Sequence, residues 1–422
     1  MRICGGALAA ETGPEQCVLI RHHVGLMIAN TQLAESEIDL WSDNSLLDPF
    51  DNYRALRDTA PVVVLKKYGV LALPRFDDVR NALRNWQVFS SSYGVGMNEE
   101  NNRVNRGSLL TSDGPEHVAL RKIIGRPLGS QAMSQLRDTI AMEADSVASR
   151  IAELGDFDGV RDLAWHLPLA VVRALVGLPE KGRERMLEWG SAGFNAGGPD
   201  NDRSRAGRIL RLEMMEYMRT TAVPGNLTPG SWGAQLYAAA ERGEIPLARC
   251  AREMSNYVGP SLDTTINATT SALWLFAEHP DQWEAICQNT GLIPNAVQEA
   301  LRIESPVQFF TRYVTEDALV DDTVVPANSR VLIMYGSANR DERHWEDPAR
   351  FDIWRDADDQ LAFGHGAHVC LGMPLARLEI ETLLLSLTKR VKRFRVAAPE
   401  RAINNSLRGF ARLPLTAELR RS

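Results

Sequence analysis

The sequence predicts a mainly α-helical fold with a minor β part, built as one large domain. Residues 116–303 consist mostly of long segments with apolar residues at helical spacing. The extended pieces are short, rich in β-branched residues, and lie outside this helical region. No Pro-, Ser- or Gly-rich linker and no change of composition divides the chain after residue 45. A single domain is therefore expected despite the length of the chain.

Residues 1–45 lack clear periodicity and are predicted to form a leader in front of a domain that covers residues 46–422. The segment 89–112 is polar, glycine-bearing and irregular. A loop of this length inside a compact domain is usually functional.

The remaining elements follow from local patterns taken in chain order. Apolar stripes predict helices at 49–59, 76–85, 116–124, 130–154, 164–176, 181–196, 203–219, 247–278, 280–289, 292–303 and 374–387. Runs of β-branched and apolar residues predict strands at 61–65, 70–74, 309–313, 324–325, 329–335, 394–396 and 413–419. The first two of these strands are expected to form a hairpin.

Composition restricts the class of protein. The chain has 422 residues, a formal net charge of −7 and five scattered cysteines. The acidity disfavours a general nucleic-acid binder, and sparse, unpatterned cysteines fit a reducing cytoplasm better than a disulfide framework. No apolar run approaches the length of a membrane-spanning helix. A cytoplasmic protein without nucleic-acid or membrane partners is expected.

One cysteine, Cys370, ends a glycine-punctuated loop and directly precedes an apolar helix-forming run. Gly366 and Gly372 would let the backbone approach a large flat group. The start of the following helix offers free N–H groups and a positive dipole end, which favour a thiolate. Such a thiolate suits an axial haem ligand.

Two other interpretations fit the same spacing. A lone cysteine before a helix is often a buried, inert apolar residue. His365, His368 and Cys370 could instead bind zinc, although zinc cysteines usually occur in pairs and the chain contains no CxxC.

The ten residues from Phe363 to Gly372 resemble the cysteine loop of the cytochrome P-450 family, Phe-x-x-Gly-x-(Arg/His)-x-Cys-x-Gly, at every fixed position. The resemblance implies a haem-thiolate monooxygenase with the fold of that family, in which Cys370 ligates the iron of haem b (iron protoporphyrin IX). It also implies O2 as a substrate. Because no flavin or ferredoxin domain is fused, it implies a separate ferredoxin and an NAD(P)H-dependent ferredoxin reductase. A monomer is expected.

Glu299 and Arg302 lie three residues apart and can pair on one helix face. Alone, such a pair is usually solvated surface decoration. The resemblance matches them to the family's Glu-x-x-Arg motif and adds Arg355 as the third member of a structural brace for the cysteine loop.

His117 and Arg121 stand at i and i+4 and could hold one anion, or could be ordinary surface charges. By resemblance they bind the haem propionates, together with Arg312 and His368. Four such groups around two carboxylates are chemically reasonable.

Pro260 interrupts the long apolar helix, and Asp263 and Thr264 follow it. An internal proline removes a backbone hydrogen bond and kinks a helix, and a buried acid is costly unless it has a purpose. An acid beside an alcohol at such a point can relay the protons that oxygen activation needs. The family pattern is Ala-Gly-x-Asp-Thr-Thr, and Pro260-Ser261 replaces its Ala-Gly. The alternative is that the threonines only bond to the helix backbone.

Further pieces resemble the bacterial subgroup that oxidises small para-substituted benzoic acids. These pieces are Ser91-Ser92-x-Gly94-Val95-Gly96, Phe194-Asn195-Ala196, residues 304–308, residues 336–341 and Leu407-Arg408-Gly409. The resemblance implies a substrate pocket lined by Tyr93, Val95, Met97, Phe194, Gly197, Asn256, Gly259, Val307 and Phe310.

Three departures from that subgroup bear on the substrate. Tyr93 replaces an arginine that helps to hold a carboxylate, Gly197 replaces a phenylalanine, and Asn256 replaces a serine. Since a buried unpaired carboxylate is expensive, oxidative O-demethylation of a methoxylated phenol of the guaiacol or syringol type is expected. The alternatives are a para-substituted benzoic acid monooxygenase, a hydrogen-peroxide-driven peroxygenase and a non-catalytic haem sensor. Asp263 and Thr264 argue against the sensor.

Arg121, Lys122 and Arg126 form a basic group that could receive an acidic ferredoxin. They could equally be ordinary solvated charges.

Overall fold

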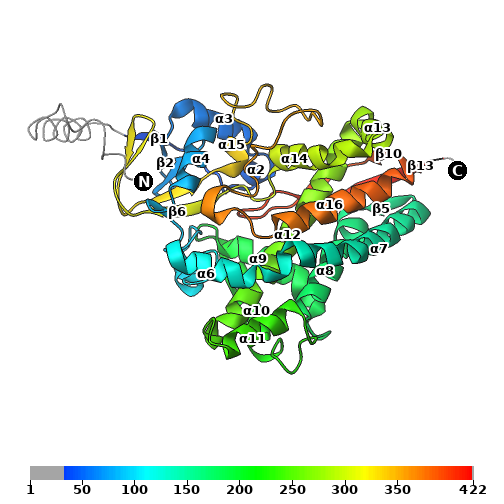
Figure 1. Ribbon diagram of the computed structural model, residues 1–422. Helices are drawn as coiled ribbons and strands as arrows, with labels where there is room; N and C mark the ends of the chain where they lie inside the picture. The colour runs from blue at the N-terminus through cyan, green and yellow to red at the C-terminus, as the bar shows by residue number, and fades with distance from the viewer. Residues whose placement is uncertain (1–32, 421–422) are drawn as a thin grey trace, which may run out of the picture.

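The computed structural model describes residues 33–420. Helices form most of this part of the chain, and the strands gather mainly in a smaller region near the described N-terminus (Figure 1). This mainly helical architecture with a minor sheet part confirms the predicted fold class. The helices longer than three residues are α2 (Asp43–Leu47), α3 (Phe50–Thr59), α4 (Phe76–Arg84), α5 (Glu99–Asn105), α6 (Gly114–Ile124), α7 (Ser130–Leu154), α8 (His166–Val176), α9 (Met186–Ala196), α10 (Asp202–Thr220), α11 (Trp232–Glu241), α12 (Leu247–Glu278), α13 (Pro280–Gln288), α14 (Ile293–Glu304), α15 (Tyr335–Ala338) and α16 (Met373–Thr388), with a π-helical turn at Gly159–Ala164.

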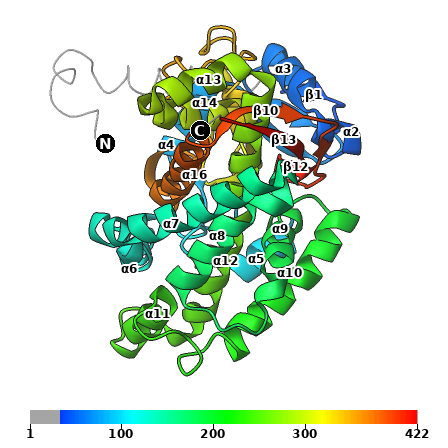
Figure 2. The same cartoon turned by 90° about the vertical axis from the view of Figure 1, so that its right-hand side faces the viewer.

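The long helix α12 is the central element of the helical region (Figure 2). It packs against α8, α9, α10 and α14. Its mostly apolar sequence explains this position, because a helix that is hydrophobic on most of its surface must be covered by others. Helix α16 lies against α7 and α14. The two longest predicted helices, 130–154 and 247–278, match α7 and α12 at both ends.

The largest sheet has six strands in the order β1-β2-β3-β9-β6-β4. A second sheet has the order β10-β13-β5, and two further pairs are β11-β12 and β7-β8. The strands are β1 (Ala34–Ser36), β2 (Val63–Leu65), β3 (Val70–Leu73), β4 (Phe89–Ser90), β5 (Asp156–Asp158), β6 (Phe310–Val314), β7 (Ala318–Val320), β8 (Thr323–Val325), β9 (Arg330–Ile333), β10 (Val391–Val396), β11 (Glu400–Arg401), β12 (Phe410–Arg412) and β13 (Pro414–Leu419). The predicted hairpin is the antiparallel pair β2-β3.

Secondary structure is already present among the described residues before the predicted boundary at residue 46. Strand β1 pairs with β2 in parallel, and Leu40 and Trp41 are buried in the core beneath the large sheet. The indole of Trp41 also donates a hydrogen bond of 3.0 Å to the carbonyl oxygen of Asn405. A three-residue strand is too short for periodicity to reveal. Residues 1–32 of the predicted leader lie outside the described residues.

Several other elements differ from the predictions, among them the following. The segment 89–112, predicted as irregular, contains β4 and α5. Helix α11 was not predicted, because its alanine-rich sequence carries little amphipathic pattern. None of the helices between residues 33 and 420 combines the length and the hydrophobicity needed to cross a membrane.

Candidate functional site

A cavity of about 340 Å³ lies between α12 and the loop that precedes α16. Cys370 lines it, and is the only cysteine of the described residues to do so. The cysteine loop is closed by a hydrogen bond of 2.9 Å from Cys370 N–H to the carbonyl oxygen of Phe363. Burial raises the pKa of the Cys370 thiol, while the N–H groups of Gly372 and Met373 and the Arg121 guanidinium act in the opposite direction. These groups favour the thiolate, the form expected for a thiol at the start of a helix, whereas burial opposes it more strongly.

The zinc interpretation does not fit this geometry. His365 is absent from the cavity lining, and its Nε2 accepts a hydrogen bond of 2.8 Å from Arg84. Within the described part of the chain, no three His, Cys, Asp or Glu side chains form a group that could hold a metal ion.

The structure shows why residue 366 is a glycine, and the reason is not the approach of a flat group. Its φ is +72°, and a Cβ there would lie 2.7 Å from the carbonyl oxygen of Leu83. Glycine is therefore required by a left-handed backbone and by the close approach of α4. At Gly372 a Cβ would meet the Sγ atom of Cys370 at 3.8 Å, an ordinary contact.

Four predicted cationic or hydrogen-bonding residues line the cavity: His117 and Arg121 from α6, Arg312 from β6, and His368 from the cysteine loop. The two imidazole rings lie 4.2 Å apart. Burial, helped by the positive charges nearby, lowers the pKa of His117 to about 4. His368 Nε2 lies 2.9 Å from Asp113 Oδ1, and this partner was not predicted.

The two arginines in this group have no carboxylate partner within residues 33–420. Arg312 donates to the carbonyl oxygen of Thr311 at 2.8 Å, and burial lowers the pKa of Arg121. Unpaired guanidinium groups beside an apolar cavity are costly unless a ligand brings anionic groups. A flat cofactor with two carboxylates fits this lining, and Cys370 would face its metal.

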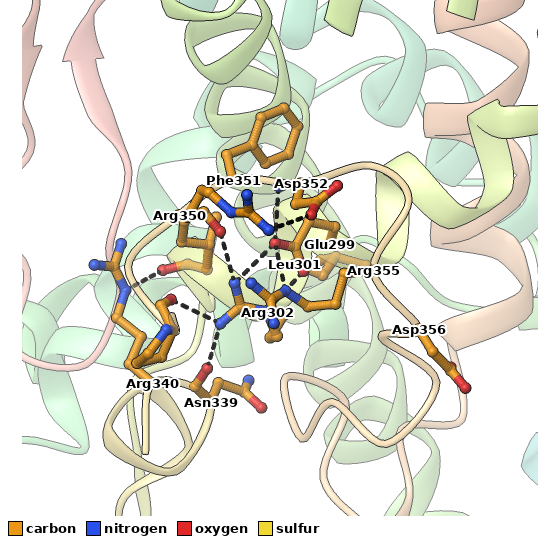
Figure 3. Close-up of polar contacts among 12 residues, drawn as sticks. Glu299, Leu301, Arg302, Asn339, Arg340, Arg350, Phe351, Asp352, Arg355 and Asp356 are labelled. Carbon is orange, nitrogen blue, oxygen red and sulfur yellow. Dashed lines mark hydrogen bonds and ion pairs between the residues drawn. The ribbon is translucent and has the colours of Figure 1, made fainter. Parts of the chain in front are cut away.

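The predicted brace is assembled in full (Figure 3). Arg302 and Glu299 are fully buried and form two hydrogen bonds of 2.6 and 2.8 Å. Arg355 Nε lies 3.3 Å from Glu299 Oε1. The surface alternative for Glu299 and Arg302 is therefore excluded.

The brace is connected to the cysteine loop through Asn339. Arg302 donates a hydrogen bond of 2.7 Å to the backbone carbonyl oxygen of Asn339. The side-chain oxygen of Asn339 accepts a hydrogen bond of 2.7 Å from the N–H group of Leu361. Leu361 stands two residues before Phe363, where the cysteine loop begins. Movement of Arg302 would thus be transmitted to the loop that holds Cys370.

Asp263 and Thr264 are neighbours in α12, but their side chains form hydrogen bonds with different partners. Thr264 lines the cavity, and its hydroxyl donates 2.6 Å to the carbonyl oxygen of Pro260. Asp263 instead faces α9, where it forms a hydrogen bond with Ser191. Burial raises its pKa to about 7, with the Ser191 bond acting against this rise. The carboxyl group can therefore hold or release a proton near neutral pH.

Eight of the nine predicted pocket residues line the cavity: Val95, Met97, Phe194, Gly197, Asn256, Gly259, Val307 and Phe310. Hydrogen bonds hold the loop that carries the first two. The N–H group of Met97 donates a hydrogen bond of 2.7 Å to the carbonyl oxygen of Gly197, and the N–H group of Thr311 donates one of 2.8 Å to the carbonyl oxygen of Val95.

The prediction for Tyr93 was wrong. Its side chain is 40% exposed and does not line the cavity. Its ring stacks on Tyr313 of β6 at 4.2 Å, and the Arg106 guanidinium lies 5.7 Å from the ring centre. A loop residue can point either way, and aromatic packing on the sheet determines its direction here.

The cavity also contains polar residues that were not predicted, above all Arg211 of α10 and Asn101 and Asn105 of α5. Arg211 belongs to a helix with several surface arginines. No local pattern distinguishes it from them.

Comparisons with known proteins agree with this geometry. The family model described as Cytochrome P450 matches residues 236–421. Cytochrome p450 CYP199A2 of Rhodopseudomonas palustris is 34% identical over 383 residues, which cover 90% of this chain and 93% of that protein. Cytochrome P450 130 of Mycobacterium tuberculosis is 30% identical over 92% of this chain and 99% of its own length.

Solved structures show the same fold. CYP109Q5 from Chondromyces apiculatus has a TM-score of 0.74 at 27% identity, covering 93% of this chain and all of that one. CYP109E1 from Bacillus megaterium has a TM-score of 0.81 at 24% identity, covering 89% of this chain and 100% of that one. The chain therefore belongs to the cytochrome P450 family, whose members are monooxygenases that hold haem b through a cysteine thiolate.

Proposed function

We propose that the protein oxidatively O-demethylates a small methoxylated aromatic compound. One atom of O2 enters a methyl C–H bond, and the resulting hemiacetal loses formaldehyde and leaves a phenol. The other oxygen atom becomes water, which consumes two electrons and two protons. The observation that carries this proposal is that Cys370 and two unpaired arginines lie on the same largely apolar cavity.

Cys370 would bind the haem iron. The loop around it, with Phe363, Gly366 and Gly372, would position the sulfur, and His117, Arg121, Arg312 and His368 would hold the two propionates. The bound haem supplies the chemistry of O2 activation and C–H oxidation. The brace formed by Glu299, Arg302 and Arg355 would keep the cysteine loop in place.

Proton supply falls to α12. Asp263 is partly buried and can hold a proton near pH 7. Thr264, one residue further on, lines the cavity, and its hydroxyl is bonded to the carbonyl oxygen of Pro260 in the same helix. We infer that Asp263 takes up protons from outside the cavity and that Thr264 passes them into it.

Electrons would come from a ferredoxin and an NAD(P)H-dependent ferredoxin reductase. Two of the three basic residues predicted to receive the ferredoxin have other contacts. Arg121 lines the cavity, and Arg126 forms an ion pair of 2.6 Å with Glu244. Lys122 remains exposed for contact with an acidic partner.

The lining suits one aromatic ring. Phe194, Val307 and Phe310 supply apolar surface. At Gly197, the nearest atom to an added Cβ would be Phe194 O at 3.5 Å. The space beside the ring therefore admits an ortho substituent, as in guaiacol or syringol.

Two candidate substrates differ in the polar group that their aromatic ring carries. The phenolic candidate was predicted from Tyr93, which lies outside the cavity. A para-methoxybenzoic acid is the second candidate, and the unexpected Arg211 in the lining favours it. Pro260-Ser261 replaces the family's Ala-Gly and changes α12 beside Thr264. A hydrogen-peroxide-driven peroxygenase is therefore retained as an alternative.

Turnover with a panel of methoxy-aromatics tests the proposal. The holoenzyme, supplied with a ferredoxin, its reductase and NADH, is incubated with guaiacol, syringol and 4-methoxybenzoate. We expect formaldehyde in proportion to the NADH consumed with at least one of them, and much less product when hydrogen peroxide replaces the electron donors. A haem-loaded enzyme that releases formaldehyde from none of them would contradict the proposal.

A further inference from the structure

Arg211 differs from the other arginines of α10 in its partners. It donates hydrogen bonds to the side-chain oxygens of Asn101 and Asn105, both of which are neutral. Arg208, one turn earlier, lies near carboxylates at the surface, Glu100 at 3.7 Å and Asp200 at 3.9 Å. Among the described residues, no carboxylate forms an ion pair with Arg211. Its positive charge therefore remains unneutralised.

The position of Arg211 makes this charge relevant to a ligand. Met214, one turn further along α10, packs close to Gly259 of α12, where an added Cβ would lie 3.8 Å from the Met214 Cε atom. Arg211, Asn256 and Gly259 line the same cavity as Cys370. In both ribbon views α12 lies between α16 and α10 (Figures 1 and 2). Arg211 therefore reaches the cavity from α10, which packs against α12, and not from the cysteine loop or from α16.

The surroundings of Arg211 favour an anion. Burial and the neighbouring Arg252 lower the pKa of Arg211 to about 10, so it stays charged at neutral pH. Two acids among the described residues line the cavity, and neither forms an ion pair with Arg211. Glu253 accepts a hydrogen bond of 3.3 Å from Leu109 N–H at Oε2, while its Oε1 has no hydrogen-bond partner. Glu379 belongs to α16. Burial without a counter-ion is costly for a cation.

Three arginines among the described residues line the cavity, Arg121, Arg211 and Arg312. Arg121 and Arg312 are, with His117 and His368, the lining residues predicted to hold the two carboxylates of the cofactor. Arg211 comes from a different helix and has no such role. One cation is left for the substrate.

We propose that Arg211 binds the carboxylate of an aromatic substrate, which orients the para substituent toward the Cys370 side of the cavity. This rests on the proposed function and specifies its substrate class. The planar guanidinium can donate two parallel hydrogen bonds to a carboxylate. Asn101 and Asn105 hold it in position without neutralising it. Arg211 thereby supplies the cation that the chain lacks at position 93.

The test compares a charged and a neutral ligand of the same shape. 4-Methoxybenzoate and 4-methoxybenzamide are titrated into holoenzyme, and the haem spin-state change gives Kd. For Arg211→Gln we expect Kd of the benzoate to rise about 30-fold or more and Kd of the benzamide to change less than about threefold. Arg208→Gln is the matched control from the same helix, and both Kd values should stay at those of the wild type.

A second variant separates charge from architecture. Asn101→Asp keeps the hydrogen bond to Arg211 but places a carboxylate beside it, so benzoate binding should weaken while benzamide binding persists. A purely structural role for Arg211 predicts instead that Arg211→Gln weakens both ligands equally and that Asn101→Asp weakens neither. Either result would overturn the inference.

The outcome is distinct from failure of the proposed function. Demethylation of neutral methoxy-aromatics with unchanged benzoate affinity in Arg211→Gln would remove only the role of Arg211. Absence of formaldehyde from every methoxy-aromatic would remove the proposed reaction, whatever Arg211 binds.

Discussion

Arg302→Ala should destabilise the fold by about 3–5 kcal/mol, because it leaves the buried Glu299 carboxylate without its main partner. Both side chains are fully buried. Arg302 also donates to the carbonyl oxygens of Asn339, Pro348 and Arg350, which would lose this donor. Chemical denaturation followed by circular dichroism measures the change, and the haem content of the purified protein reports on the cysteine loop.

Arg350→Ala is the matched control for this brace. Arg350 lies in the loop that also carries Arg355, but its side chain is 60% exposed and pairs with Asp347 and Asp352 near the surface. Such pairs contribute about 0–1 kcal/mol. If Arg302→Ala unfolded with a free energy within about 1 kcal/mol of the wild type and kept its haem, the brace would not have the proposed role.

Asp263→Asn should lower the rate of product formation by about 100-fold, the usual scale for loss of a positioned proton donor. Substrate binding should persist, because Asp263 faces Ser191 of α9 and not the cavity. Burial raises the pKa of Asp263 to about 7. The protonated form therefore declines as pH rises through 7, and wild-type kcat should decline with it. The variant should lack this dependence.

The control for Asp263→Asn is Glu278→Gln, which removes an exposed acid at the C-terminal end of the same helix. It should retain the wild-type rate and pH profile. Asp263→Asn with a rate within threefold of the wild type, or with an unchanged fall of kcat above pH 7, would contradict the proton-supply role.

Long helices were predictable because their hydrophobic repeat extends over many turns. Helices α7 and α12 are examples, with both ends predicted. Several short elements, such as β1, β4 and α5, were not. The parallel strand β1 forms because Leu40 and Trp41 bury themselves under the sheet. That contact joins segments far apart in the chain, and no window of the sequence contains it.

The site was predictable where a motif fixes several residues at once. Resemblance to the family motifs placed Cys370, Arg302 and Arg121 in groups that the structure brings together. It failed for single side chains whose direction depends on packing. Tyr93 turns outward onto Tyr313, and Arg211, one arginine among several in α10, points inward. Arg211 thus supplies a cation to the cavity. The prediction of a phenolic substrate assumed that the cavity has no such cation, so it loses its electrostatic basis.

The most direct test of the account is the absorption spectrum of the reduced protein under carbon monoxide. A thiolate from Cys370 predicts a Soret maximum characteristic of thiolate-ligated haem and distinct from that of imidazole-ligated haem. Cys370→His should move the band to the imidazole position while haem remains bound. An imidazole-type band in fresh native protein, or a thiolate-type band that survives Cys370→His, would contradict the account.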